Sequence, residues 1–323
     1  MITRRMAVAG LLATASAMPA QAQVFPSKPL RFVIPFPAGG IVDIVGRAVG
    51  EKMATLLGQP VVMDNRPGGN SAIATDIVAK APPDGHTWLL ATVSHVVVPH
   101  LQKVEFDPIG DFAGVAWLAV VPTIAVVPAA SEFKTMADLV TAARDGPESL
   151  TYLNPGAGTS IHLNVELLRQ RTGARLTSIP YRGLPPGIPD LLEGRIDLAL
   201  LSPPLCLQHI KAGRLRAPAI AGNARHRDLP DVPTFPEAGL SDSVVESWYT
   251  ILVPAKTPKD VIARLHDAAV AALKDAEVLK RLDNAAAVPP VTPASPADVE
   301  ALIKRDFARY RELVKAAGIK VEG

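Results

Sequence analysis

Short apolar runs alternate along the first third of the chain with longer segments in which apolar residues recur at helical spacing. The runs predict strands, and the spaced segments predict helices between them. The strands are Leu30–Ile34, Val61–Met63 and Thr87–Thr92, and the helices are Ile41–Leu57 and Ser71–Ala81. This alternation is typical of an α/β fold with a parallel sheet, which has helices on both faces and binds ligands at the carboxyl ends of its strands.

The same alternation returns in the middle of the chain. The pattern there predicts helices at Met136–Asp145, Thr159–Thr172, Asp190–Glu193 and Leu205–Ala212, and strands at Leu150–Leu153, Leu176–Ile179, Ile196–Leu201 and Arg216–Ala221. We therefore expect two lobes, each with a mainly parallel sheet flanked by helices.

Two further apolar stretches connect the lobes. Val115–Val127, interrupted by Pro122, leads into the second lobe, and Val245–Val253 leads back. Two amphipathic helices, Lys259–Ala276 and Ala297–Ala317, then return to the first lobe. Two crossings form a hinge, about which the lobes can close on a ligand. The expected limits are residues 23–125 with 251–323 for lobe 1, and residues 126–250 for lobe 2.

A glycine-rich loop joins a strand to a helix in each lobe. The first loop holds Gly39 and Gly40, and the second holds Gly156 and Gly158. Glycine lets the backbone approach a ligand, and the unpaired N–H groups of the following helix attract an anion. Because the first loop has no Lys, Arg or His, an anion there would be held by backbone amides and water. Either loop alone is equally well explained as a plain connection, whereas the pair suggests two lobes that face one ligand.

The first 22 residues have the features of a secretory signal peptide. Arg4 and Arg5 precede an apolar run, and Ala20-Gln21-Ala22 matches the small-x-small cleavage pattern. The leader holds two of the 33 Lys and Arg residues and none of the 31 Asp and Glu, so the mature chain has a formal net charge of zero. That balance favours neither nucleic acid nor an anionic membrane as a partner.

Residue types that carry catalytic or metal chemistry are scattered. The seven histidines have no metal-binding spacing, so we expect no metal and no cofactor. The single cysteine, Cys206, is expected to pack as a small apolar residue. Asp43 either stabilises the start of its helix or contacts a ligand, and His95 is either structural or a ligand contact. Thr159 either caps its helix or donates to a bound carboxylate, and we expect the second.

A series of short motifs extends along the mature chain in a specific order. They are Phe25-Pro-Ser-Lys-Pro29, Pro35-Phe-Pro-Ala-Gly-Gly-Ile-Val-Asp43, Asp64-Asn-Arg-Pro-Gly68, Ala79-Lys-Ala-Pro-Pro-Asp-Gly85, Pro155-Gly-Ala-Gly-Thr-Ser-Ile-His-Leu163, Pro180-Tyr-Arg-Gly183 and Leu229-Pro-Asp-Val-Pro-Thr-Phe-Pro-Glu-Ala-Gly239. In this order and spacing, the chain resembles the Bug-type extracytoplasmic solute receptors of tripartite tricarboxylate transporters. The resemblance covers essentially all of the mature sequence.

The resemblance implies a two-lobed periplasmic binding protein of the type II kind, monomeric and without enzyme activity, that binds a small organic carboxylate. Membrane transporter subunits are the implied partners. The implied ligand contacts are Pro37, Ala38, Gly39, Gly40, Ile41 and Asp43 in the first loop, Ser94 and His95 at a strand end, Gly156, Gly158, Thr159 and His162 in the second loop, and Ser202. Three of these positions depart from the family pattern: Ala38, Ile41, and Ser202 with the two prolines after it. The first two remove a possible hydroxyl donor, and the third favours a more apolar carboxylate over aspartate- or glutamate-like ligands.

We therefore expect a periplasmic receptor that closes on a small organic carboxylate and presents it to a transporter or a sensory system. The alternative is a secreted α/β enzyme that acts on a small carboxylate through Asp43, His95 and His162. The fate of the ligand separates the two functions, because a receptor returns its ligand chemically unchanged.

The leader generates the first testable prediction. The secreted protein should begin at or near Gln23, because signal peptidase cleaves after the small residue that ends the leader. Intact-mass spectrometry of the periplasmic fraction measures this directly. A periplasmic product that still starts at Met1 would contradict it.

Overall fold

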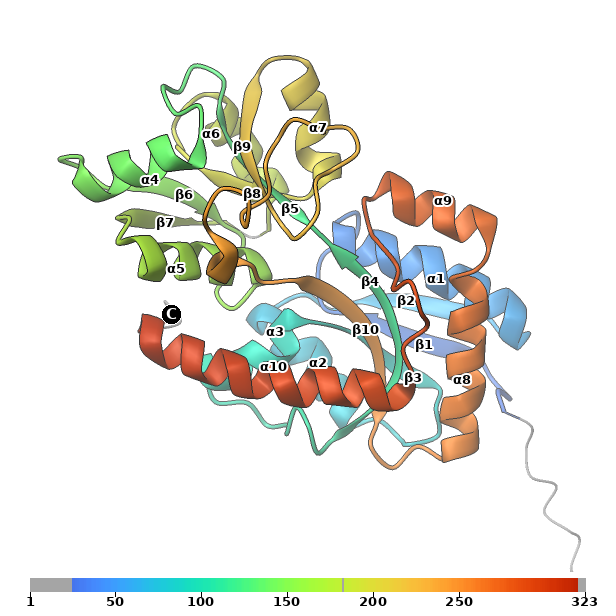
Figure 1. Ribbon diagram of the computed structural model, residues 1–323. Coiled ribbons are helices and arrows are strands. Elements are labelled where there is room, and N and C mark those ends of the chain that lie inside the picture. Colours follow the sequence, from blue (N-terminus) through green and yellow to red (C-terminus); the bar gives the residue numbers. More distant parts are fainter. Residues whose placement is uncertain (1–24, 182, 319–323) are drawn as a thin grey trace, which may run out of the picture.

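A computed structural model of the protein describes residues 25–181 and 183–318. The expected signal peptide and its cleavage site lie outside these residues. The chain forms two lobes, each built on a β-sheet with helices around it (Figure 1). The first lobe contains the start of the described chain and its last three helices, and the second lobe contains the middle of the chain.

The sheet of the first lobe has five strands in the order β2-β1-β3-β10-β4. They are β1 (Leu30–Ile34), β2 (Val61–Asn65), β3 (Thr87–Thr92), β4 (Phe112–Val121) and β10 (Ser247–Pro254). β1 pairs in parallel with β2 and β3. β10 runs antiparallel between β3 and β4, so it is the one strand of this sheet with the opposite direction.

The second lobe repeats this arrangement. Its strands are β5 (Thr123–Pro128), β6 (Leu150–Asn154), β7 (Leu176–Pro180), β8 (Ala199–Leu201) and β9 (Leu215–Ala221). β6 and β7 pair in parallel, β5 runs antiparallel between β8 and β9, and a parallel bridge between Tyr152 and Leu198 joins the two groups. The expectation of two lobes with mainly parallel sheets is confirmed. Each sheet also contains one antiparallel strand that the sequence pattern did not reveal.

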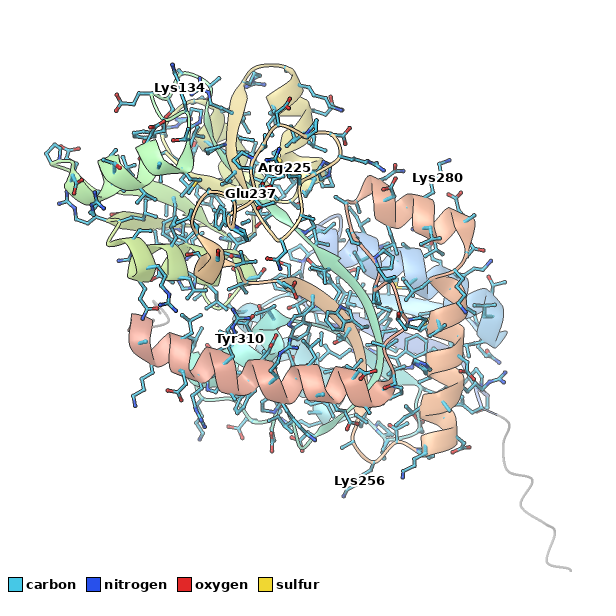
Figure 2. The ribbon with its side chains drawn as sticks, viewed as in Figure 1. Lys134, Arg225, Glu237, Lys256, Lys280 and Tyr310 are labelled. Atoms are coloured by element: carbon cyan, nitrogen blue, oxygen red, sulfur yellow. The ribbon has the colours of Figure 1, made fainter. Side chains whose placement is uncertain are left out.

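Both antiparallel strands belong to the crossings between the lobes. β4 leads through Pro122 into β5, and residues 222–246 lead from β9 into β10, which lies beside β4 (Figure 1). The return segment is held by an ion pair between Arg225 and Glu237, 2.9 Å apart, both labelled in Figure 2. Because β5 and β10 extend across the expected lobe limits, those limits stay a prediction.

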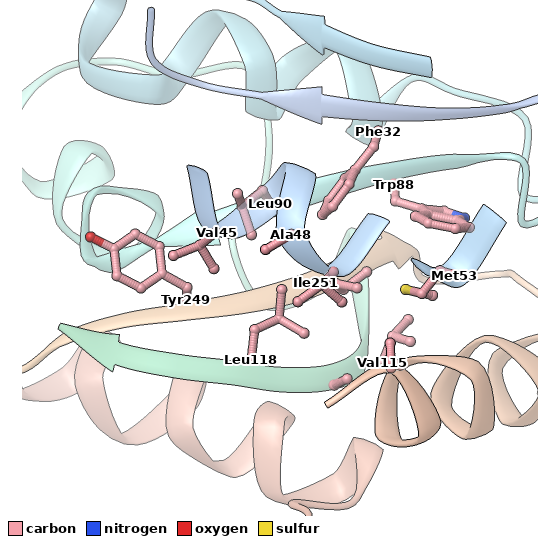
Figure 3. Packing of buried hydrophobic residues seen from close by; sticks show 14 of the residues in the cluster. Phe32, Val45, Ala48, Met53, Trp88, Leu90, Val115, Leu118, Tyr249 and Ile251 are labelled. Atoms are coloured by element: carbon pink, nitrogen blue, oxygen red, sulfur yellow. The ribbon is translucent and has the colours of Figure 1, made fainter. Parts of the chain in front are cut away.

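The first sheet is buried on both faces because its strands alternate their side chains between two cores. Phe32 and Leu90 point into one core, and Val33 and Leu89 point into the other. Figure 3 shows the first of these cores, in which Phe32 and Trp88 pack with side chains of α1. Strands covered on both faces read as continuous apolar runs, and such runs are what predicted them.

Six helices cover the two faces of the first sheet. They are α1 (Ile41–Leu57), α8 (Lys259–Ala272) and α9 (Ala276–Asn284) on one face, and α2 (Ala72–Ala79), α3 (Val93–Leu101) and α10 (Pro296–Ala317) on the other. Tyr310 of α10 is almost fully buried and lies on the inner side of that helix (Figure 2). The same core includes Leu163 and Leu167 of α5, so α10 also contacts the second lobe.

The second lobe has its own continuous core, from Ile124 to Val244. Its helices are α4 (Met136–Asp145), α5 (Ser160–Thr172), α6 (Ile188–Leu192) and α7 (Pro203–Lys211). Three short 3-10 helices complete the described elements, at Gly69–Ser71, Pro185–Gly187 and Ser241–Ser243.

Two helices differ from the sequence-based expectation. Helix α3 follows β3 directly and was not predicted, because a valine-rich run with an internal Pro99 does not look helical. The expected helix Lys259–Ala276 ends at Ala272, and α9 begins afresh after it. The Asp275 side chain accepts hydrogen bonds from the backbone N–H groups of two residues in the first turn of α9, so it caps a new helix at the second-last position of the expected one.

Asn164 couples α5 to the return crossing. Its side chain is fully buried, and its amide donates to Val245 O (3.1 Å) and accepts from Val245 N (2.8 Å). Val245 lies just before β10, at a point where the backbone has no strand partner. One side chain thus satisfies both buried backbone groups of that residue.

Asn164→Ala should lower the free energy of unfolding by about 2 kcal/mol or more, because it leaves two buried backbone groups without partners. The midpoint of urea unfolding measures the change. Asn223→Ala is the matched control, since that exposed amide makes a single bond to Glu246, at 3.3 Å, and its loss should cost less than about 0.5 kcal/mol. Equal midpoints for the two variants would show that Asn164 does not anchor the crossing.

Candidate functional site

A cavity of about 450 Å³ lies between the two lobes. Its lining includes the starts of α1 and α3 from the first lobe and of α5 and α7 from the second. These helices follow β1, β3, β6 and β8, whose carboxyl ends face the cleft. Since a helix that follows a strand begins at the strand's carboxyl end, four helix N-termini meet at one cavity.

The N-termini of α1 and α3 offer free backbone donors. Their N-caps are Gly40 and Thr92, and neither makes a side-chain capping bond within the described chain. Thr92 borders the cavity, and its buried hydroxyl has no hydrogen-bond partner among the described residues. Unpaired N–H groups and the positive end of the helix dipole both favour a bound anion.

The first glycine loop is held in shape by Asp43. Its carboxylate accepts hydrogen bonds from Gly39 N (3.0 Å), Arg47 Nε (2.8 Å) and Asn65 Nδ2 (2.9 Å). Asn65 also donates to Phe36 O, at the start of the loop. Burial alone would raise the pKa of Asp43, but these hydrogen bonds outweigh it and hold the pKa below its ordinary value. Asp43 therefore stays ionised and orients the loop.

The second glycine loop is held in shape by His162. Its Nδ1 accepts a hydrogen bond from Gly158 N, 3.1 Å away, and its Nε2 lies 3.7 Å from Glu166 Oε1. Glu166 also accepts from Tyr152 and Arg169, so the ring belongs to a buried polar network. A histidine with Nδ1 as acceptor carries its proton on Nε2, where it faces the carboxylate.

Gly158 also brings the two lobes into direct contact. Its φ is +77°, and a Cβ there would lie 2.8 Å from Leu101 Cδ1 of α3, so only glycine fits. Ser94 of α3 donates to Gly158 O at 3.4 Å, and the hydroxyls of Ser160 and Ser247 contact each other across the lobes. The second loop thus packs against α3 from Ser94 in its first turn to Leu101 at its last residue.

The comparisons with known proteins bear on this cavity. The model of the tripartite tricarboxylate transporter family receptor matches residues 45–319, which is most of the chain. The chain belongs to this receptor family. Protein BugT of Bordetella pertussis is 31% identical, and the alignment covers 99% of each chain. The resemblance to Bug-type receptors is thereby confirmed.

Two solved structures of similar receptors carry ligands. Rpa4515 of R. palustris, with adipate, has a TM-score of 0.83 at 31% identity, over 92% of this chain and 99% of that one. MatC of Rhodopseudomonas palustris, with bound malate, has a TM-score of 0.81 at 29% identity, over 90% of this chain and 100% of that one. The fold is therefore that of periplasmic binding proteins, and the family is one of receptors.

Eight of the expected contacts of this receptor border the cavity. They are Pro37, Ala38, Gly39, Gly40, Ile41, Ser94, Thr159 and Ser202. The Thr159 hydroxyl donates to Gly156 O (2.9 Å) and accepts from His162 N (3.2 Å), so it caps α5 and its one proton is directed away from a ligand.

Five expected contacts lie behind the cavity wall. They are Asp43, His95, Gly156, Gly158 and His162, which the lining does not include. Asp43 and His162 shape the two loops, and His95 belongs to a separate aromatic cluster. The alternative enzyme would use Asp43, His95 and His162 together at the ligand, but each of them is engaged in its own local network.

Sequence reasoning missed several lining residues. Thr92 ends a predicted strand beside Ser94, so its position on the strand could have pointed to it. Tyr249 and Ser247 come from β10, which lies more than 150 residues after β1, β2 and β3 in the sequence. Leu184 and Leu205 are ordinary apolar residues with no local signal for a ligand site.

The described residues contain no group of three or more His, Cys, Asp or Glu that could hold a metal ion. Cys206 is fully buried, as expected for a small apolar residue, and burial raises the pKa of its thiol to about 12. No helix within residues 25–181 and 183–318 is long and apolar enough to cross a membrane.

His95 is a structural residue of the α3 region. Its ring is 1% exposed, stacks on Phe106 and meets Phe112 edge-on. Nε2 donates to Pro108 O at 2.9 Å, while Nδ1 has no partner among the described residues. Burial lowers the pKa of His95 to about 4, so the ring is neutral at pH 7.

The buried His95 should make stability depend on pH. Its pKa is about 4 when folded and about 6.5 when unfolded, so its contribution is complete above pH 6.5 and is lost as the pH falls toward 4. Between pH 7.5 and 4.5, the free energy of unfolding should fall by about 2.5 kcal/mol more in the wild type than in His95→Gln, which keeps a donor but does not titrate. Urea unfolding at both pH values measures this. Identical losses would show that His95 is protonated in the folded state.

Proposed function

We propose that this protein is a periplasmic receptor that binds a small organic carboxylate between its lobes and presents it to a tripartite tricarboxylate-type membrane transporter. It acts as a monomer without a cofactor, after loss of residues 1–22, and the hinge between lobe 1 and lobe 2 closes on the ligand. Family membership and the adipate and malate bound to similar receptors support this function.

The proposal rests mainly on one observation: the N-termini of several helices border the same cavity between the lobes. Helices α1 and α3 direct uncapped N–H groups to the same space as the second glycine loop. Backbone amides hold a carboxylate by hydrogen bonds from neutral donors, which are weaker than the salt bridge that a buried arginine would form. The weaker interaction suits a protein that must release its ligand. A volume of about 450 Å³ is suited to a small organic molecule.

The proposed contacts divide into two groups. Pro37, Ala38, Gly39, Gly40, Ile41, Ser94, Thr159 and Ser202 touch the ligand. Asp43, Gly156, Gly158 and His162 act behind them and keep the loops in a binding shape before the ligand arrives. Such preorganisation lowers the entropy that binding costs.

Three measurements test the function as a whole. Native mass spectrometry of protein purified without dialysis should reveal a retained carboxylate. Calorimetric titration with malate, adipate, hexanoate and benzoate should find at least one binder. Long incubation should return that acid unchanged, and its conversion would support the alternative of a secreted enzyme.

Gly39→Ala tests the amide loop with a control at the other end of the same helix. Gly39 and Gly58 both have a left-handed φ, of +81° and +72°, and an added Cβ would meet nothing within 4 Å at either one. Both substitutions should therefore cost about 1–2 kcal/mol of stability through backbone strain alone.

Only Gly39→Ala should weaken binding, by about tenfold or more, because strain there displaces the amides that face the cavity. Gly58→Ala should leave affinity within about twofold. The dissociation constant of the tightest acid in the panel is measured for both variants. An equal effect of the two substitutions on affinity would exclude the first loop as the anion site.

A further inference from the structure

Tyr249 brings a phenol hydroxyl to the cavity from within the first sheet. It lies on β10, borders the cavity and is only 5% exposed. Its ring packs in the same core as Val45 of α1. Figure 3 shows the hydroxyl at the end of the ring that points away from Ile251. The core therefore holds the ring in place while the side chain reaches the ligand space.

The Tyr249 hydroxyl has no hydrogen-bond partner among the described residues. The hydroxyls of Tyr152 and Tyr181, in the second lobe, each donate to a carboxylate. Burial raises the pKa of Tyr249, so its hydroxyl is a neutral donor at pH 7. Buried polar groups in proteins are nearly always hydrogen-bonded, so an open donor beside a cavity is suited to a group of a ligand.

The position of Tyr249 in the sheet puts it beside the starts of α1 and α3. It pairs directly with Thr92 of β3, and Thr92 is the N-cap of α3. Directly paired residues on neighbouring strands point to the same face of the sheet, with Cβ atoms about 5 Å apart. α1 packs on that face, since Val45 in its second turn shares a core with Tyr249. Neither helix has a side-chain capping bond at its N-cap, so both starts offer N–H groups to an anion.

Resting on the proposed function, we propose that Tyr249 is a ligand contact: its hydroxyl donates a hydrogen bond to the carboxylate that the starts of α1 and α3 attract. β10 is hydrogen-bonded on both sides, to β3 and β4, so this donor is in place before a ligand arrives. A hydrogen bond to a charged acceptor is stronger than one between neutral groups. The site thus combines backbone amides with a fixed side-chain donor.

Tyr249→Phe tests this contact, because it removes the hydroxyl and keeps the ring. The probe is whichever of malate, adipate, hexanoate and benzoate the wild type binds most tightly. Calorimetric titration of the dialysed protein at pH 7.5 should give the variant a dissociation constant about tenfold higher or more. Without ligand, the midpoint of urea unfolding should stay the same or rise, since no hydrogen bond of the folded protein is lost. A lower midpoint with wild-type affinity would show that the hydroxyl is purely structural and would overturn the inference.

Tyr310→Phe is the matched control. Tyr310 is 1% exposed, lies in α10 and does not border the cavity. Its hydroxyl likewise has no hydrogen-bond partner among the described residues. The same chemical change there should leave the dissociation constant within about twofold of wild type. Equal losses of affinity in the two variants would show that Tyr249 has no particular role at the ligand.

A double variant with Gly39→Ala shows which group of the ligand Tyr249 contacts. Gly39→Ala displaces amides of the first loop, so both substitutions act on one carboxylate if the inference is right. Their combined loss of affinity should then be smaller than the product of the two single losses. A combined loss equal to that product would place Tyr249 at another group of the ligand and overturn the inference, with the receptor function intact. Binding of none of the four acids, with no retained carboxylate in native mass spectrometry, would overturn the receptor function itself.

Discussion

The unpaired N–H groups at the starts of helices are the constraint on which the rest of this structure depends. Each helix has such donors, and a buried cleft can leave them open only where a ligand or water satisfies them. Here the parallel strands end at one edge of each lobe, so the starts of α1, α3, α5 and α7 all face the same space. Both lobes thus contribute helix starts to the lining of one cavity.

The polar side chains next to the two glycine loops fix the conformation of those loops. Asp43 accepts from Gly39 N and His162 accepts from Gly158 N, so each glycine loop is fixed by the helix that follows it. Both side chains are almost fully buried, at 3% and 6% exposure. The site is therefore prepared by groups that do not line it, and the cavity is left to backbone amides, a few hydroxyls and apolar surface.

The hinge and the site share the same backbone. β10 lies antiparallel between β3 and β4 and also carries Ser247 and Tyr249 into the cavity lining. Asn164 ties α5 to Val245, two residues before β10. One of the two connections between the lobes is therefore a strand that also borders the cavity.

Local sequence signals determined much of this protein. Apolar runs predicted the strands, helical spacing predicted most helices, and the motifs around Gly39 and Gly158 predicted both loops, because these features depend on neighbours in the chain. The tertiary structure decided the rest. It showed that β5 and β10 run antiparallel, that α3 is a helix, and that Thr92, Leu205 and Tyr249 border the cavity. It also placed His95 and His162 behind the wall. Whether a side chain faces a ligand or a core depends on residues that are distant in sequence, and a single sequence carries no record of those contacts.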